Sequence, residues 1–340
     1  MKILLSGYHN PNFETLTEYT EAAIRELGEH PIAFDDRDFW FPGTVREWSG
    51  ALQRWDVGHL NRRLVALASA QRPDVCLVQG GHRISAESLR AMKAMGIVTV
   101  LWTIDAPGSS GLPYETAPWY DLVLCGGTEA VELLKAAGVA RARWLPFGCP
   151  STLGPCPTLN DQERLAYESD VCFVGAYYPN REALFESLAG LDFIVRGPGW
   201  GRLSKHSPLS ALARDQQVSP AEWKKIYAAS KIVLAVHYQD GRSPCYQASP
   251  RVFEAMACGA FLLSDAQRDV ATLFKDGEHL ALFHDAQELR RKITHYLSHP
   301  LERARIAEQG RRETMKSHTY LRRMEQVLAM VRTIQARGKA

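Results

Sequence analysis

The chain has 340 residues, of which 46% are hydrophobic and 23% charged, so its composition excludes bulk disorder. Lys and Arg number 40 against 38 Asp and Glu, a net charge of +2 that gives no support to a dedicated polyanion binder. We therefore expect no nucleic-acid partner. No apolar run approaches the roughly 20 residues of a membrane helix, so no integral membrane segment is expected either.

Short apolar runs alternate with helical patterns through the first half of the chain. Continuous runs of 4–6 apolar residues separated by helices indicate parallel strands buried on both faces, and hence a doubly wound α/β domain. The expected strands are 2–7, 31–34, 75–80, 97–102, 122–127 and 142–147, and the expected helices lie near 14–27, 58–71, 85–95 and 128–137.

The same pattern restarts after residues 148–168, which have no clear period, contain three prolines and read as a linker. A second α/β half follows, with a helical tail over about 285–336. Its expected strands are 170–175, 192–197, 231–236, 260–264 and 280–283, with helices near 180–189, 220–229, 250–258 and 268–274.

The start of the chain, MKILLSGYHN, lacks the apolar core of a secretory signal and reads as a first strand. The seven cysteines include no CxxC pair, and four of them, Cys76, Cys125, Cys172 and Cys258, lie inside apolar runs. Buried, reduced thiols of this kind indicate a cytoplasmic protein rather than a disulfide framework or a zinc site.

Ligands of open parallel sheets bind beyond the carboxyl ends of the strands, where glycine lets backbone N–H groups approach them closely. Gly7 and Gly175 stand at such ends and are candidate contacts for a ligand. Asp105 and His82 end two neighbouring strands, which makes them candidates for acid–base chemistry or for binding sugar hydroxyls. A turn cap at Asp105 and an exposed loop position at His82 are the alternatives.

The segment SPRVFEAMACG, residues 249–259, is the most informative in the chain. Ser249 suits a helix N-cap, and Arg251 falls in the first turn, where free N–H groups favour an anion. Glu254 lies on the same face of a helix that is otherwise small or apolar. Arg251 is therefore a candidate diphosphate ligand and Glu254 a candidate acceptor of ribose hydroxyls, unless the two only pair with each other.

Two further residues of the second half are candidates for phosphate contact. Arg181 lies six residues after Gly175, in the first turn of a helix that Asn180 is expected to cap. His237 follows a strand. Its side chain either contacts a phosphate or sugar oxygen of a ligand or makes a structural hydrogen bond. The GPGWG stretch at 197–201 lacks G-x-G-x-x-G spacing, which disfavours a nicotinamide enzyme, and no cluster has metal-ligand spacing.

Two α/β halves with the helix SPRVFEAMACGAFLLSD in the second resemble GT-B glycosyltransferases of the large group-1, family 4-like kind. More narrowly, VCFVGAYYPNREALF, VHYQDGRSPCYQASPRVFEAMACG and the tail from His284 are similar to the CgeB-type, spore-coat-protein glycosyltransferase-like family. The resemblance implies two Rossmann-like domains facing a cleft: an acceptor-binding domain at 1–150, a nucleotide-sugar-binding domain at 165–318, and a C-terminal helix, 319–340, that crosses back to the first domain.

The resemblance also implies transfer of a sugar from a nucleotide diphosphate donor to a hydroxyl acceptor with retention of configuration. Because no cluster of residues has metal-ligand spacing, we expect no metal or other cofactor. Glu254 matches the family glutamate that holds the ribose. The first position of the family's E-x7-E pair is Tyr246 here. The expected nucleotide-sugar site consists of Glu254, Arg251, Ser249, Arg181, Gly175, His237, Val218 and Gly7.

Two alternatives to this function are a GT-B-fold nucleotide-sugar epimerase and a non-catalytic nucleotide-sugar-binding protein. An inverting enzyme would need a base, for which Asp105 or His82 is the candidate. The aromatic segment 39–55, with Trp40, Trp48 and Trp55, either shapes the acceptor side or forms a packed surface flap. The sequence does not name the sugar, the base or the acceptor.

Overall fold

The structure, a computed structural model, describes residues 1–104 and 115–337, apart from the side chain of Glu47. It forms two compact units. Unit 1 comprises Met1–Pro146 and Tyr320–Ala340, and unit 2 comprises Phe147–Thr319. The sequence predicts domains at 1–150 and 165–318 and a crossing helix at 319–340, whereas unit 2 already begins at Phe147.

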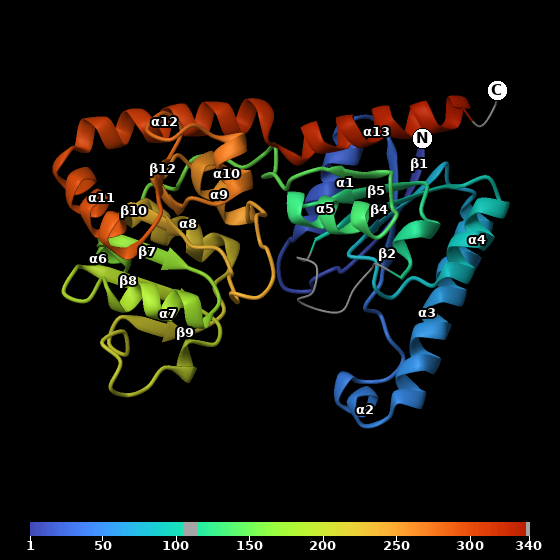
Figure 1. Cartoon of the computed structure of the whole chain (residues 1–340), viewed down its shortest axis with the longest axis horizontal. Helices are drawn as coiled ribbons and strands as arrows, with labels where there is room; N and C mark the ends of the chain where they lie inside the picture. The colour runs from blue at the N-terminus through green and yellow to red at the C-terminus, as the bar shows by residue number, and fades with distance from the viewer. Residues whose placement is uncertain (105–114, 338–340) are drawn as a thin grey trace. The chain divides into compact units, whose positions relative to one another are not determined.

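Unit 1 is built on a six-stranded parallel sheet of order β2-β1-β3-β4-β5-β6 (Figure 1). Its strands are β1 (Lys2–Gly7), β2 (His30–Asp35), β3 (Val75–Gln79), β4 (Val98–Thr103), β5 (Leu122–Cys125) and β6 (Ala142–Trp144). Its helices are α1 (Leu16–Glu26), α2 (Gly43–Trp48), α3 (Gly50–Gln71), α4 (Ala86–Ala94), η1 (Ala117–Trp119), α5 (Thr128–Ala136) and α13 (Tyr320–Arg337). Every residue of β3, β4 and β5 is buried, as the continuous apolar runs predicted.

Unit 2 has a second six-stranded parallel sheet, of order β12-β11-β10-β7-β8-β9. Its strands are β7 (Ser169–Val174), β8 (Phe193–Gly197), β9 (Ala213–Asp215), β10 (Ser230–Ala235), β11 (Leu262–Asp265) and β12 (Ala281–Phe283). Its helices are α6 (Asp161–Tyr167), α7 (Pro179–Glu186), η2 (Trp200–Arg202), α8 (Pro220–Ala229), α9 (Pro250–Ala257), α10 (Arg268–Leu273), α11 (Ala286–Ser298) and α12 (Pro300–Ser317). The expected fold class, two Rossmann-like halves, is confirmed.

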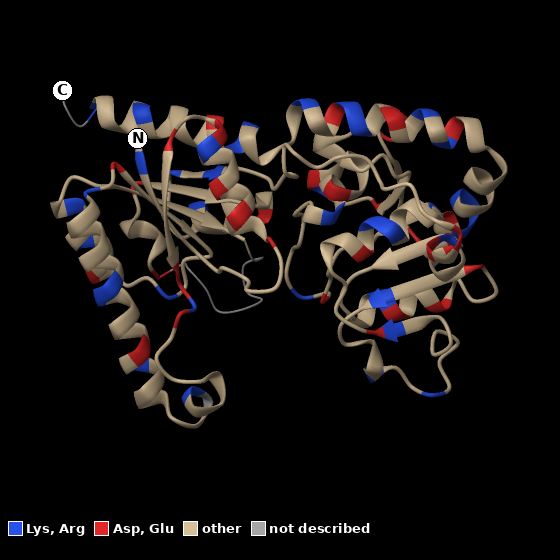
Figure 2. Ribbon diagram, turned by 180° about the vertical axis from the view of Figure 1, so that it is seen from behind, with Lys and Arg blue, Asp and Glu red and all other residues tan. Residues whose placement is uncertain are grey.

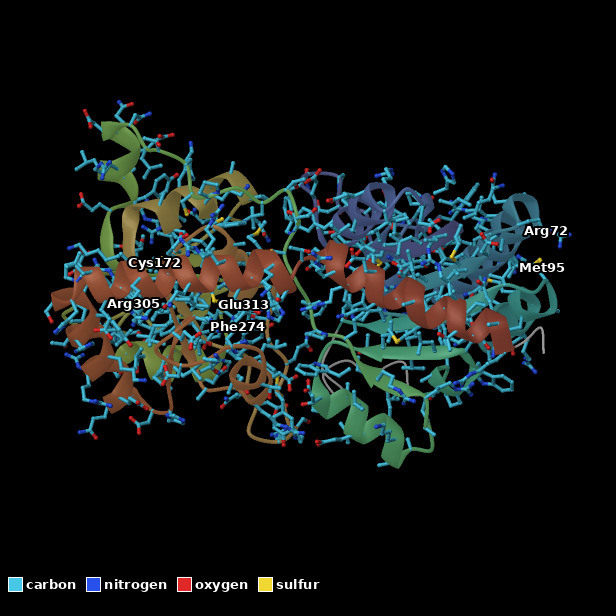
Figure 3. The ribbon with its side chains drawn as sticks, turned by 90° about the horizontal axis from the view of Figure 1, so that it is seen from above. Arg72, Met95, Cys172, Phe274, Arg305 and Glu313 are labelled. Atoms are coloured by element: carbon cyan, nitrogen blue, oxygen red, sulfur yellow. The ribbon has the colours of Figure 1, made fainter. Side chains whose placement is uncertain are left out.

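Helix α13 belongs to unit 1, although α11 and α12, which precede it, belong to unit 2. It packs beside α1 (Figure 3), and its Tyr320 ring stacks on Tyr19 with centroids 6.0 Å apart. Arg323, which is buried, donates from Nε to the carbonyl of Pro146 at 2.9 Å. The C-terminal helix therefore returns to the first unit, as the fold resemblance implied.

Three local expectations differ from the structure. Helix α3 begins at Gly50 rather than near residue 58, because Ser49 caps it by accepting the N–H of Leu52. The expected linker at 148–168 lies within unit 2 and contains α6, whose cap Asn160 forms a reciprocal capping box with Glu163. The three-residue strand β9, on the sheet edge, is too short to leave a period in the sequence.

Candidate functional site

The carboxyl ends of β7 and β10 lie side by side in unit 2, at the point where the strand order reverses. This topological switch point is where open α/β sheets bind ligands. Gly175 follows β7, and His237 follows β10 by two residues. Contacts among these residues, Arg181 and Arg251 place all four at this edge, so the structure brings together most of the residues that sequence analysis proposed for unit 2.

Two guanidinium groups share the ring of Phe173 at this edge. Arg251 and Arg181 each place their guanidinium carbon 5.1 Å from the Phe173 centroid. Burial, together with the neighbouring charge of Arg251, lowers the pKa of Arg181 to about 9, so Arg181 is still cationic at neutral pH. Neither of them is ion-paired with a carboxylate of the described residues. Two adjacent unpaired cations at a switch point are suited to binding an anion.

The two arginines differ in how firmly they are held. Arg181 is buried and donates to the carbonyls of Val236 and Ala176, at 2.9 and 2.7 Å, which ties the end of β10 to the loop after β7. Arg251 is half-buried and makes no hydrogen bond to the described residues. Arg181 therefore has a structural role beside any phosphate contact, whereas the Arg251 donors remain available to a ligand.

Gly175 is required by close packing around the Arg251 side chain. A Cβ atom at this position would lie 2.6 Å from Nη2 of Arg251 and 2.9 Å from the ring of Phe173. The Gly175 carbonyl also accepts the indole N–H of Trp200 at 2.8 Å. The glycine thus leaves the space in which the Arg251 guanidinium lies.

Helix α9 presents Glu254 one turn beyond Arg251. The alternative reading, an ion pair between Arg251 and Glu254, is not observed, and the Glu254 carboxylate has no hydrogen-bond partner among the residues described. Burial raises the pKa of Glu254 against the attraction of Arg251 and Lys224. A partly buried carboxylate without a partner is costly, so its retention is consistent with a ligand that supplies hydroxyl donors.

His237 is buried and uses both ring nitrogens within the protein. Nε2 accepts the backbone N–H of Ser249 at 3.1 Å, so Nδ1 carries the hydrogen and donates to Asp265 at 2.6 Å. Burial alone would raise the pKa of Asp265, but the adjacent His237 and the hydrogen bonds from His237 and Gln267 outweigh it and lower that pKa. Of the two readings of His237, the structural hydrogen bond is the one observed.

Ser249 is the N-cap of α9, as expected, but its side chain makes no capping hydrogen bond. Asn180 is not a cap: Tyr178 occupies that position of α7, because Pro179 and Asn180 already lie in its first turn. Asn180 instead donates to the carbonyl of His237 at 2.8 Å, while its Oδ1 is buried without a partner. Val218 is half-buried just before α8, with no described contact to these groups.

The remaining candidates belong to unit 1. Gly7 ends β1, where a Cβ atom would lie 2.7 Å from the hydroxyl of Thr17, so close packing against α1 accounts for this glycine. His82 is exposed, yet desolvation and the charges of Arg83 and Arg37 lower its pKa to about 4, which makes it a weak proton acceptor. Asp105 lies outside the described residues.

Sequence reasoning missed the parts of the site that hold other residues in place. Phe173 is one of several apolar residues of a buried strand, and nothing in the sequence marks it as the ring under two arginines. The charge of Lys224, on α8, acts on Glu254 although α8 lies about 20 residues before α9 in the chain. Asp265 ends β11, and its bond to His237 depends on the pairing of β10 with β11.

Residues 181–329 match the family described as glycosyl transferase-like. The spore protein CgeB of Bacillus subtilis (strain 168) is 24% identical over 267 residues, which cover 74% of this chain and 80% of that protein. Among solved structures, Anabaena HepE in complex with UDP-glucose superposes with a TM-score of 0.65 at 14% identity, over 98% of this chain and 100% of that one. Sucrose-phosphate synthase from Thermosynechococcus elongatus gives 0.69 at 13% identity, over 99% of both chains.

The two parallel-sheet units and these matches define the class: the chain has the GT-B fold of the glycosyltransferases, enzymes whose general activity is sugar transfer. Within that class it is similar to CgeB, in agreement with the resemblance read from the sequence. No helix in the described part of the chain is both long and apolar enough to span a bilayer.

Proposed function

We propose that the protein transfers a sugar from a nucleotide diphosphate donor to a hydroxyl acceptor, and that unit 2 binds the donor. The observation that carries this proposal is the pair of guanidinium groups on Phe173, close to a carboxylate on α9 that has no hydrogen-bond partner in the described part of the chain. A nucleoside diphosphate offers both complements: an anion for Arg251 and ribose hydroxyls for Glu254. The UDP-glucose complex of the similarly folded HepE supports the same donor class.

The charge on the diphosphate would be met by Arg251, with Arg181 behind it, and by the N-terminus of α9. The first N–H groups of a helix favour an anion, and Ser249 leaves them uncapped by its side chain. This arrangement would stabilise the leaving diphosphate without a metal ion. Unit 1 would then recognise the acceptor, as the family resemblance implies.

The family resemblance also favours retention of the anomeric configuration, in which the leaving diphosphate helps to deprotonate the acceptor on the same face of the sugar. The low pKa of His82 fits this route, because a weak base at that position is poorly suited to activate an acceptor hydroxyl. Proton NMR of the first-formed product tests the proposal. An inverted anomeric configuration would refute it and would direct attention to Asp105.

Calorimetric titrations with UDP, GDP and their nucleosides test the donor site. Arg251→Gln should weaken the binding of a nucleoside diphosphate by about 10- to 100-fold, the usual effect of losing a charged hydrogen bond, and should leave the binding of the free nucleoside unchanged. Glu254→Gln should weaken the binding of both ligands, because both contain the ribose. Arg312→Gln, at an exposed position on α12, is the control. Equal affinity of all variants for the true donor would show that the donor does not bind at α9.

The two alternative functions give different results with donor alone. An epimerase would isomerise the donor without any acceptor, and a binding protein would bind it without turnover. Tyr246 bears on the second alternative, because its ring lies under Arg268, with the guanidinium 4.9 Å from its centroid, where the family carries a glutamate. Release of nucleotide that depends on an acceptor would exclude both alternatives.

A further inference from the structure

Three tryptophans are exposed on one projection of unit 1. Trp40, Trp48 and Trp55 are 70%, 89% and 46% exposed, and Val45 beside them is 36% exposed. They lie in residues 39–55, which we call the aromatic tip; it contains α2 and the first turn of α3. Figure 1 shows α2 at the end of α3 that points away from the sheet of unit 1. The Trp40 and Trp55 rings also contact His59, with centroids 5.9 and 5.3 Å apart, so the segment is packed in part and still exposes its indoles.

The aromatic tip is fixed to α3 by a buried carboxylate. Asp56 is 1% exposed and accepts the backbone N–H groups of Trp40 at 2.8 Å and Phe41 at 3.2 Å. It also pairs with Nε of Arg46 at 3.6 Å, and the Arg46 guanidinium stacks on Phe39 at 3.8 Å from its centroid. Asp56 thus fixes the backbone of the tip at Trp40 and Phe41.

The surroundings of the aromatic tip are cationic. Residues 37–63 contain five arginines against three carboxylates. Asp38 pairs with Arg63 at 2.6 Å, and Asp56 is occupied by Arg46. Arg54 and Arg62, on α3, are exposed and have no ion pair with the described residues. Figure 2 shows basic positions on α2 and along α3.

These features together fit an anionic lipid surface. Tryptophan prefers the boundary between water and hydrocarbon, because its large ring is apolar and its N–H is polar, and arginine pairs with lipid phosphates. Arg54 and Arg62 also line a pocket between α3 and α4, but no tryptophan of the tip is among the residues that line it, so a small anion bound there would leave the indoles exposed. We propose that the aromatic tip docks the protein on membranes containing anionic lipid, with Trp40 and Trp48 inserted at headgroup depth and Arg54 and Arg62 against the phosphates.

Vesicle co-sedimentation tests this proposal with the full chain. The protein should bind vesicles of phosphatidylcholine with phosphatidylglycerol, and bind much less to phosphatidylcholine alone. The double variant Trp40→Ser, Trp48→Ser should lose at least about tenfold in lipid affinity, because it removes two interfacial anchors. Arg54→Gln with Arg62→Gln should weaken binding about tenfold at low salt, and by less as salt rises.

Trp119→Ser is the matched control, because Trp119 is 41% exposed in unit 1 but lies outside the tip. It should bind vesicles as the parent protein does. Tryptophan fluorescence should shift to shorter wavelength on adding anionic vesicles, and the tip variant should lose most of this shift. All variants should keep the parent melting temperature, since the substituted side chains are exposed.

Three results would overturn the proposal. One is no binding of the parent protein to either vesicle; another is equal binding by the tip variant. The third is a lower oligomeric mass of the tip variant in sedimentation, with vesicle binding unchanged, which would assign the tip to contacts between copies of the chain. Titrations of the same variants with the donor test the proposed function independently of vesicle binding, because the tip lies in unit 1 and the proposed donor residues lie in unit 2.

Discussion

Glu254, the proposed ribose ligand, carries a cost in stability when no ligand is bound. Burial raises its pKa above the ordinary value of 4.5, against the attraction of Arg251 and Lys224. Ionisation of Glu254 therefore costs more free energy in the folded protein than in the unfolded chain. Without ligand, the negative charge destabilises the fold at any pH above that ordinary value.

Glu254→Gln is expected to stabilise the ligand-free protein at neutral pH. The gain should be absent below about pH 4, where both states hold a neutral group, and should grow as the pH rises until the carboxylate is fully ionised. A rise in melting temperature of roughly 1–4 °C is the typical size for relieving a functional-site cost. Thermal denaturation between pH 4 and 8 measures it, with Glu308→Gln at a more exposed position of α12 as the control. A lower melting temperature at pH 7 would contradict this account.

At the scale of an element, α9 depends on a neighbouring strand end for its position. His237 links Asp265, at the end of β11, to the backbone N–H of Ser249, just before the first turn of α9. Two bonds through one ring fix the distance between the sheet and the helix N-terminus. His237 is a positioning residue in this view, since it acts on the donor through α9.

Two replacements of His237, each of which keeps one of its two hydrogen bonds, should separate the effects of these bonds. Gln places its Oε1 near the position of Nε2 and keeps the acceptor for Ser249, whereas Asn keeps the donor to Asp265 and leaves the Ser249 N–H without its partner. We expect His237→Asn to raise KM for the donor about tenfold or more with a smaller change in kcat, and His237→Gln to recover much of that loss. Steady-state kinetics give both parameters. Identical KM values for the two variants would show that the bond to Ser249 does not position α9.

At the scale of the whole molecule, the C-terminal helix completes the core of the unit in which the chain begins. Tyr320, Met324, Val327, Leu328 and Val331 of α13 are buried in unit 1. Tyr320 also meets Trp102 of β4 edge to face, with centroids 6.4 Å apart. Residues more than two hundred positions apart in the chain therefore contribute to one hydrophobic core.

Met324→Ala should destabilise unit 1 by roughly 2–5 kcal/mol, the usual cost of truncating a buried Met. Hydrogen exchange is the suitable measurement, because it reports the two units separately. Protection should fall in β1 and β4 of unit 1 and stay unchanged in the strands of unit 2. Gln326→Ala, on the exposed face of the same helix, is the control. A uniform loss of protection in both sheets would mean that the units unfold together.

The sequence by itself determined the two α/β halves, because continuous apolar runs followed by helical periods leave few other ways to bury the strands. It also singled out Arg251 and Glu254, since a cap, a proline and a glycine mark both ends of α9 in the sequence. Signals of this kind involve only a few neighbouring residues, so they can be recognised without a structure.

Only the tertiary structure decided how the candidate residues are used. Arg181 and His237 are committed to carbonyl, carboxylate and backbone partners from other strands and loops, whereas Arg251 and Glu254 have no hydrogen-bond partner among the described residues. The position of Trp40 likewise depends on the buried Asp56, which accepts its backbone N–H. The physical reason is the same in each case: a polar group is free or occupied according to what the fold brings within hydrogen-bond distance, and those partners lie far away in the sequence.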